Sequence, residues 1–192
     1  VHLYGGVVPD SGVQKWLGEV YAKTTEYVRE HEEVKTELQE MLVKLEARDS
    51  SVWPLFEKTR GESLRGFEAI MQELGVVHTK VFLESEVKDR GQQKVDELLA
   101  SGIATVGEGG AIIADLSKHG LDIALLRKST GAGLYMTSDL ALAEKKFAEF
   151  QVGESINITG TEQNFYFKQL FKVLELSGFE HKMTHVGYGL VN

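Results

Sequence analysis

Three side chains in the second half of the sequence, Tyr135, Asp139 and Gln163, have the types and spacing of a small ligand-binding site. We expect Asp139 in the first turn of a helix, where the positive end of the helix dipole favours a carboxylate. Gln163 is expected in the first turn of the next helix, after a strand that stops at Gly160. In a parallel sheet both strand-to-helix junctions lie at the carboxyl edge, where open α/β folds bind ligands. The three side chains are therefore predicted to point into one crevice.

Each candidate also has a simpler interpretation. Asp139 could be no more than a carboxylate at a helix start, and Gln163 could be an ordinary polar residue in a first turn. His185 is expected to finish a buried strand with a satisfied ring nitrogen rather than to act in catalysis. Gly187 and Gly189, which follow it, allow close approach of a backbone to a ligand.

Helices and strands that position these residues can be predicted from the hydrophobic pattern. Apolar spacings of three, four and seven predict two helices from Val13 to about Ala47, and one more that runs to about Leu74 and stops at Gly75. Strand and helix patterns then alternate. We predict strands at Val76–Leu83, Leu121–Arg127, Ser155–Thr159 and Met183–Val186, a hairpin of Ile103–Val106 with Ala111–Ala114, and helices at Lys88–Ser101, Leu140–Phe150 and Glu162–Ser177.

Two details of this prediction bear on the site. A further strand is expected to end near Tyr135 and Met136, with Thr137 or Ser138 capping the helix that follows. The strands at Ile156–Thr159 and Met183–Val186 are expected to be parallel neighbours, because a helix separates them.

Composition limits the classes of protein to consider. The 192 residues are 42% apolar and 26% charged, which is typical of a globular protein. No apolar run approaches the roughly 20 residues that span a bilayer, and no signal-peptide pattern is present, so we expect no membrane partner. The lack of cysteine fits a reducing compartment, and we expect the cytoplasm. A net charge of −8 argues against this chain gripping nucleic acid unaided.

Catalytic and metal-binding motifs are not assigned. The turn Gly107-Glu-Gly-Gly110 lacks the Lys-Ser/Thr pair and the helix of a phosphate loop. In His31-Glu-Glu-Val-Lys35 a lysine replaces the second histidine of a zinc-protease helix. No Ser/His/Asp constellation can be defended, so we predict neither a catalytic residue nor a metal ligand in this sequence.

Three sequence blocks carry a family resemblance. They read Tyr-x-Thr-x-Asp-Leu-Ala at 135–141, Gln-x-x-Tyr-Phe-x-Gln at 163–169 and His-Val-Gly-Tyr-Gly-Leu-Val at 185–191. In order and approximate spacing they resemble blocks of the arginyl-tRNA synthetases, which are class I aminoacyl-tRNA synthetases. The resemblance is clearest from about Lys80 to Val191.

The resemblance implies roles for the candidate residues. Tyr135, Asp139 and Gln163 would bind arginine, with Asp139 as the planar carboxylate that a guanidinium needs for a bidentate pair. Tyr166 stands where the family usually has histidine, and a phenol cannot match the acid-base range of an imidazole near neutral pH. The ATP side of the site would include Tyr166, His185, Gly187 and Gly189.

The resemblance also implies a fold and an activity. The fold would be α/β, with a partial Rossmann-like nucleotide-binding core, a helical amino-terminal section and a small inserted α+β region. Residues 1–75 would form the helical section, 76–120 the inserted region with its hairpin, and 121–192 the second half of the core. The parent protein would activate L-arginine with ATP, accompanied by Mg²⁺, and transfer it to tRNA-Arg in protein biosynthesis. The tRNA would bind through parts of the parent outside this sequence.

Two family signatures do not occur in the sequence. Class I synthetases hold the ATP phosphates with a His-x-Gly-His signature and a Lys-Met-Ser-Lys-like loop, and neither is found here. Such groups stabilise the charge that develops during activation, which is usually the largest catalytic effect. We therefore expect an interior fragment of the catalytic domain that is inactive alone. The alternatives are a non-catalytic arginine- or nucleotide-binding α/β module, and an unrelated nucleotide-binding domain.

Overall fold

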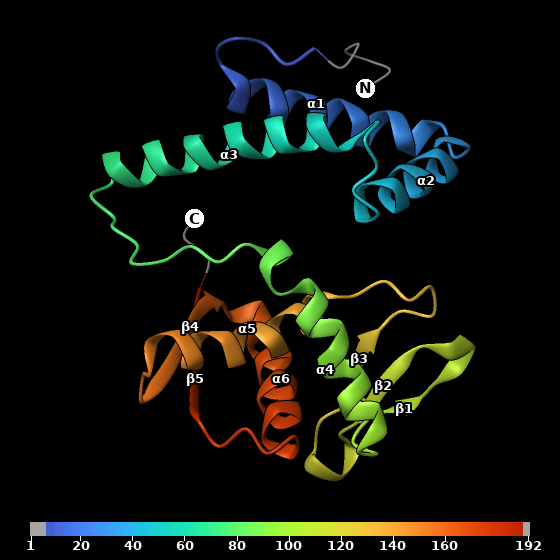
Figure 1. Ribbon diagram of the computed structural model, residues 1–192, viewed down its shortest axis with the longest axis vertical. Coiled ribbons are helices and arrows are strands. Elements are labelled where there is room, and N and C mark those ends of the chain that lie inside the picture. Colours follow the sequence, from blue (N-terminus) through green and yellow to red (C-terminus); the bar gives the residue numbers. More distant parts are fainter. Residues whose placement is uncertain (1–6, 190–192) are drawn as a thin grey trace. The chain divides into compact units, whose positions relative to one another are not determined.

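The computed structural model describes residues 7–189 and divides the chain into two compact units, Val1–Lys80 and Val81–Asn192. The first unit is helical, and the second contains every strand of the described part (Figure 1). Within the described range, no helix combines the length and the apolar character needed to cross a membrane. The mixed α/β class predicted from the sequence is confirmed.

The first unit consists of α1 (Val13–Glu30), α2 (Val34–Glu46) and α3 (Trp53–Glu73), so the predicted helices are confirmed. A proline in the first turn of α3 is tolerated because the amide that it lacks would have no partner there. The chain leaves α3 through Gly75, whose φ of 68° suits glycine. Nε2 of Gln14 on α1 donates to the Glu62 carbonyl oxygen on α3 at 3.1 Å, which ties the two helices together.

The second unit holds a three-stranded antiparallel sheet in the order β1-β2-β3, formed by Thr105–Val106, Ile112–Asp115 and Ile123–Arg127. The predicted hairpin is confirmed, since Val106 pairs with Ile112 in antiparallel register. The sequence pattern at 121–127 also forms a strand, but β3 pairs antiparallel with β2 and does not join a parallel sheet. The reason is the short connection between them, because parallel strands need a crossover of a dozen residues or more.

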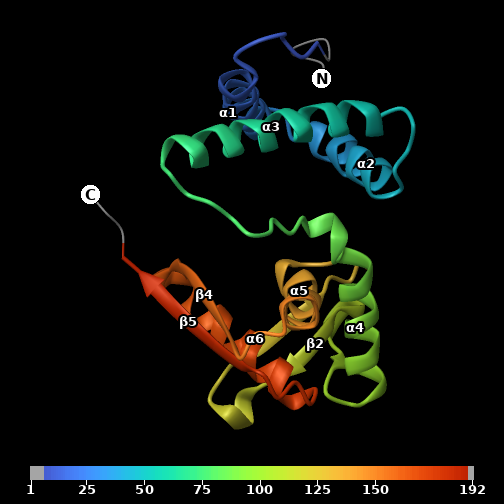
Figure 2. The same ribbon diagram turned by 60° about the vertical axis from the view of Figure 1, so that its left-hand side comes forward.

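A separate parallel pair follows, formed by β4 (Glu154–Gly160) and β5 (Lys182–Tyr188). Ile156 lies opposite Thr184 and Ile158 opposite Val186, so the two strands are parallel neighbours as predicted. Figure 2 shows the pair side by side. The crossover consists of the short 3₁₀ helix η4 (Thr161–Gln163) and α6 (Asn164–Leu176), which places the start of α6 beyond the carboxyl end of β4.

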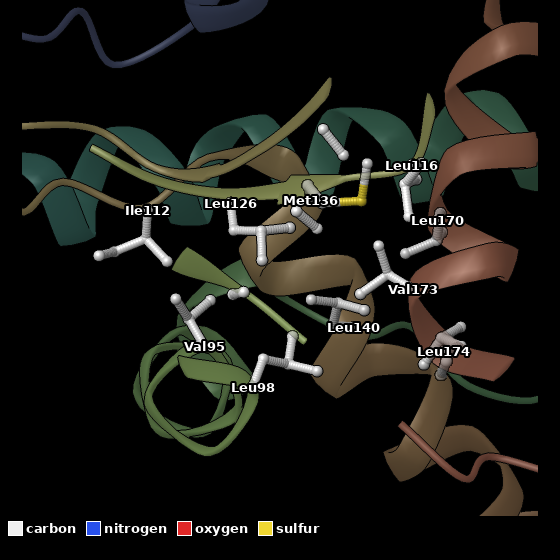
Figure 3. Close-up of a cluster of buried hydrophobic side chains, with 14 of the residues drawn as sticks. Val95, Leu98, Ile112, Leu116, Leu126, Met136, Leu140, Leu170, Val173 and Leu174 are labelled. Atoms are coloured by element: carbon white, nitrogen blue, oxygen red, sulfur yellow. The ribbon is translucent and has the colours of Figure 1, made fainter. Parts of the chain in front are cut away.

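The core of this unit lies between the antiparallel sheet and three helices: α4 (Lys88–Ala100), α5 (Tyr135–Phe150) and α6 (Figure 3). Aliphatic side chains from all of these elements meet there, and the largest fully buried ones are Val95, Leu98, Leu116, Leu126, Leu140, Val173 and Leu174. The core therefore fixes α5 and α6, the two helices on which the candidate residues Asp139 and Tyr166 lie.

The predicted strand at Val76–Leu83 is wrong. This segment has no strand pairing among the described residues and leads into the 3₁₀ helix η1 (Glu84–Glu86). Its valines read as a strand because of their β propensity, but Val77 is 93% exposed and no neighbouring strand covers it.

Candidate functional site

The first element of the site is α5, which begins at Tyr135 instead of Leu140, so no strand ends at Tyr135 and Met136. The residue before the helix is Leu134, and its amide donates to the Thr137 hydroxyl at 2.9 Å. That hydroxyl donates in turn to the Leu126 carbonyl oxygen at the end of β3. The prediction that Thr137 or Ser138 is the N-cap is wrong. Thr137 lies in the first turn, and its hydroxyl reaches back to the amide of the N-cap residue, like the third helical residue of a capping box.

This earlier start changes how two candidate residues relate. Tyr135 and Asp139 are four residues apart on one helix, so they lie on the same face, one turn apart. Tyr135 is 79% exposed and its ring is free to meet a ligand, whereas Asp139 is half-buried. The two predicted arginine ligands of the first block therefore share one surface.

Asp139 is joined to α6 by a hydrogen bond that spans 27 residues of sequence. The Tyr166 hydroxyl donates to Oδ2 of Asp139 at 2.5 Å, and both side chains are partly buried. Burial raises the pKa of Asp139, while the hydrogen bond from Tyr166 and the charge of Lys146 lower that pKa. Burial and the Asp139 charge raise the pKa of Tyr166 far above its usual value, so the phenol remains a donor. The pair is thus a carboxylate held by a permanent neutral donor.

A second carboxylate lies beside this pair and was not predicted. The Ser138 hydroxyl donates to Oε1 of Glu84 at 3.3 Å, although the two residues are 54 positions apart. The negative charge of Glu84 adds to the causes that raise the pKa of Asp139. Glu84 belongs to a short acidic stretch before α4, which is the one sequence feature that could have suggested it as a site residue. Its place beside Asp139 depends on the packing of η1 against α5. Two neighbouring carboxylates favour a cationic ligand.

No basic side chain neutralises Asp139 directly. Among the residues that the structure describes, no lysine or arginine lies within the 4.0 Å of an ion pair with its carboxylate. Some other carboxylates of this unit are paired: Glu144, for example, lies 2.6 Å from Nζ of Lys94. Asp139 therefore has the capacity to accept hydrogen bonds from a ligand cation.

The structure does not bring Gln163 into contact with the other two predicted arginine ligands. It is exposed at the end of η4, just before α6 begins, and no hydrogen bond joins it to Tyr135 or Asp139 within the described part of the chain. It lies three residues before Tyr166, so it belongs to the same turn region of the crossover as the Asp139 partner.

Of the residues predicted for the ATP side, His185, Gly187 and Gly189 lie on or just after β5, whereas Tyr166 lies on α6 and bonds Asp139. Nε2 of His185 is 2.7 Å from the Thr159 hydroxyl oxygen, and the imidazole stacks on Phe167 at 4.3 Å. The ring nitrogen of His185 is satisfied, as its simpler interpretation predicts, but the residue is half-buried and lies in the middle of β5, which continues to Tyr188. A Cβ on Gly187 would lie 3.2 Å from the Thr161 Cα, so this glycine permits the approach of η4, whereas the space around Gly189 is open.

Comparison with known proteins places the chain in a family. A family model described as tRNA synthetases class I (R), catalytic domain, matches residues 10–192. The arginine–tRNA ligase of Bacteroides fragilis is 36% identical over 157 residues, which cover 81% of this chain and 26% of the ligase. The ligase of Treponema pallidum is 31% identical over 181 residues, which cover 93% and 31%. This chain thus spans about a quarter to a third of the length of these relatives.

Solved structures agree on the fold. The arginyl-tRNA synthetase of Plasmodium falciparum aligns with a TM-score of 0.71 at 21% identity, over 83% of this chain and 28% of that one. A putative arginyl-tRNA synthetase from Campylobacter jejuni aligns with a TM-score of 0.64 at 17% identity, over 74% and 32%. The resemblance carried by the three sequence blocks is confirmed, and the chain belongs to the family of class I (R) tRNA synthetases, within its catalytic domain.

Proposed function

We propose that this chain carries the arginine-binding part of an arginine–tRNA ligase, with Asp139 as the ligand of the guanidinium group. The observation that carries this proposal is the environment of Asp139: half-buried, fixed by a neutral donor from Tyr166, and without an ion-pair partner among the described residues. A guanidinium is always charged and presents its N–H groups as a planar fork, which matches a carboxylate in two parallel hydrogen bonds.

The neighbouring residues fit this assignment. Tyr135 lies one turn before Asp139 on the same face of α5, where its exposed ring can pack on the side chain of the amino acid. Glu84, which is bonded to Ser138, adds negative potential near Asp139. Gln163, by resemblance to the family, would hold the main-chain groups of the amino acid, and this role requires the bound arginine to reach from α5 to η4.

The complete reaction belongs to the parent protein. It would activate L-arginine with ATP, supplied with Mg²⁺ as a substrate complex, and transfer it to tRNA-Arg in the cytoplasm. Tyr166, His185, Gly187 and Gly189 lie on the α6–β5 side, where the resemblance places ATP. Because the His-x-Gly-His and Lys-Met-Ser-Lys-like signatures do not occur in these 192 residues, we expect no arginine-dependent pyrophosphate exchange by this chain alone. A robust exchange signal from the pure chain would contradict this expectation.

Calorimetric or NMR titration of the 192-residue chain with L-arginine and L-lysine tests the arginine site. We expect a preference for arginine, because an ammonium is a point charge and loses the bidentate pair. Asp139→Asn should weaken arginine binding by about 10- to 100-fold, since hydrogen bonds to charged groups contribute roughly 1.5–3 kcal/mol. Tyr135→Phe should cost less, because the ring and its packing remain.

Asp122→Asn is the matched control. Its carboxylate is exposed in the same unit and makes no side-chain hydrogen bond or ion pair with the residues that are described, so arginine binding should not change. If wild type and Asp139→Asn bind arginine equally well, Asp139 is a helix-start carboxylate only and the assignment fails.

A further inference from the structure

The structure assigns a positioning role to Tyr166: its hydroxyl holds the Asp139 carboxylate in the orientation that receives a guanidinium. The inference rests on the proposed arginine site and adds a residue to it. Tyr166 would act through Asp139, without touching the reacting atoms. Tyr166 also stands where the family resemblance places a histidine, so this device would be a feature of this chain.

The hydrogen bond leaves the ligand-binding capacity of Asp139 intact. An ionised carboxylate offers about four acceptor positions on its two oxygens, and the Tyr166 hydroxyl uses one of them, on Oδ2 at 2.5 Å. The remaining positions on Oδ1 and Oδ2 suffice for the two parallel N–H···O bonds of a guanidinium. The contact between the two side chains therefore prepares the site and does not block it.

The donor is anchored by the core of the second unit. The Tyr166 ring packs against the hydrophobic core and meets Phe167 edge-on, with ring centroids 5.3 Å apart. Phe167 is itself buried and stacks on His185. Asp139 in turn lies on the half-buried face of α5. Fixing the carboxylate before the ligand arrives reduces the ordering cost of binding, which is the physical content of preorganisation.

Tyr166 also influences the charge of Asp139. The groups that act on this carboxylate come from three elements: Tyr166 on α6, Lys146 on α5 and Glu84 on η1. Burial and Glu84 raise the pKa of Asp139, whereas the Tyr166 hydrogen bond and Lys146 lower that pKa. Removing the hydroxyl leaves burial and Glu84 opposed by Lys146 alone, so the pKa of Asp139 must rise.

This shift gives the proposal a measurable signature in pH. Arginine keeps its charge throughout the accessible range, so the loss of binding on acidification follows the protonation of Asp139. In Tyr166→Phe that loss should begin at a higher pH than in wild type. If Tyr166 acted through packing alone, Tyr166→Phe would bind arginine as wild type does at every pH, because the phenylalanine ring retains the packing and carries no charge.

The experiment compares wild type, Tyr166→Phe and Asp139→Asn in the full 192-residue chain. L-arginine is titrated calorimetrically across the acidic-to-neutral range, and the Asp139 carboxyl carbon is followed by NMR in the same samples. We expect Tyr166→Phe to bind arginine on the order of tenfold more weakly at neutral pH, with both the binding profile and the Asp139 titration moved to higher pH. Tyr21→Phe, which removes an exposed hydroxyl in the other unit, should match wild type.

Each outcome decides between the two proposals. If Asp139→Asn loses arginine binding while Tyr166→Phe binds as wild type does, the positioning role is wrong and the arginine site stands. Weaker binding by Tyr166→Phe with an unchanged Asp139 titration also overturns the positioning role, because the hydroxyl would then act without its hydrogen bond to Asp139. If wild type fails to discriminate arginine from lysine, the arginine site itself is refuted, and the positioning role of Tyr166 is refuted together with it.

Discussion

Gly91 lies where α4 passes over the first turn of α5, and we predict that Gly91→Ala destabilises the second unit. A Cβ at this position would stand 2.3 Å from the Thr137 carbonyl oxygen and 2.9 Å from its carbonyl carbon. Close carbon–oxygen contacts in proteins are about 3.3 Å or longer, so α4 must move by about 1 Å. The obstacle is backbone and not the end of a flexible side chain, which means that no rotamer change can relieve the clash.

The magnitude follows from two opposing effects. Overpacking in a well-packed interior costs about 1–3 kcal/mol, and alanine is favoured over glycine in a helix interior by about 1 kcal/mol. The turn that would be displaced also carries the buried Thr137 hydroxyl, which bonds Leu134 and Leu126. We therefore place the overpacking cost at the upper end and expect a net loss of about 1–2 kcal/mol, or roughly 4–8 °C in Tm for each kcal/mol in a unit of this size.

Gly61→Ala in α3 is the matched control, because the nearest atom to its Cβ would be Nη1 of Arg65 at 3.8 Å. There the helix preference acts alone, and stability should rise by up to about 1 kcal/mol. Urea unfolding is followed by circular dichroism. Tryptophan fluorescence would report only on the first unit, because both tryptophans, Trp16 and Trp53, lie there. If Gly91→Ala proves as stable as wild type while Gly61→Ala behaves as expected, the close contact between α4 and α5 is not real.

Two further predictions concern charge. Glu144 lies 2.6 Å from Nζ of Lys94, which is 8% exposed, and 2.8 Å from Nη2 of Arg90. Glu144→Ala should cost about 2–4 kcal/mol in urea unfolding, because it leaves the buried ammonium with only the longer contact to Glu97 at 3.9 Å; a loss no larger than that of a surface ion pair would contradict this. Because the pKa of Asp139 is raised on folding, its ionised form lowers stability at neutral pH, and this cost is recovered as the pH falls through the folded pKa. Asp139→Asn should therefore be more stable than wild type at pH 7, by a difference in unfolding free energy that shrinks on acidification. If unfolding curves at several pH values give the same difference between the two proteins, this prediction is wrong.

Local signals were sufficient to predict much of the fold. The helices of the first unit, the hairpin and the parallel pair each follow from a short hydrophobic pattern bounded by glycine or proline, and they are present. The start of α5 was missed because Tyr135 and Thr137 have weak helix propensities, which outweighed the stronger one of Met136. Tertiary contacts fix it instead, through the Thr137 hydroxyl and through the close approach of Gly91. No partner was predicted for β3, since a strand pattern does not name its partner.

The candidate site shows the same division. Tyr135 and Asp139 could be identified from one short block, because they are neighbours in sequence and on one helix face. The hydrogen bond from Tyr166 spans 27 positions, and the contact from Ser138 to Glu84 spans 54. Both depend on how α6 and η1 pack against α5, and no spacing rule in a single sequence encodes that packing.

The pKa directions distinguish Asp139 from the structural aspartates of this chain. Asp49 and Asp115 each accept two hydrogen bonds from a serine two residues later, and these bonds lower their pKa values. Their carboxylates order a turn, and the two hydrogen bonds from the serine stabilise the charged form of each carboxylate. The pKa of Asp139 is raised instead, because burial outweighs the single bond from Tyr166. A carboxylate whose charge lowers stability gains most from a ligand of permanent positive charge, so binding of arginine should lower the pKa of Asp139 and stabilise the second unit together.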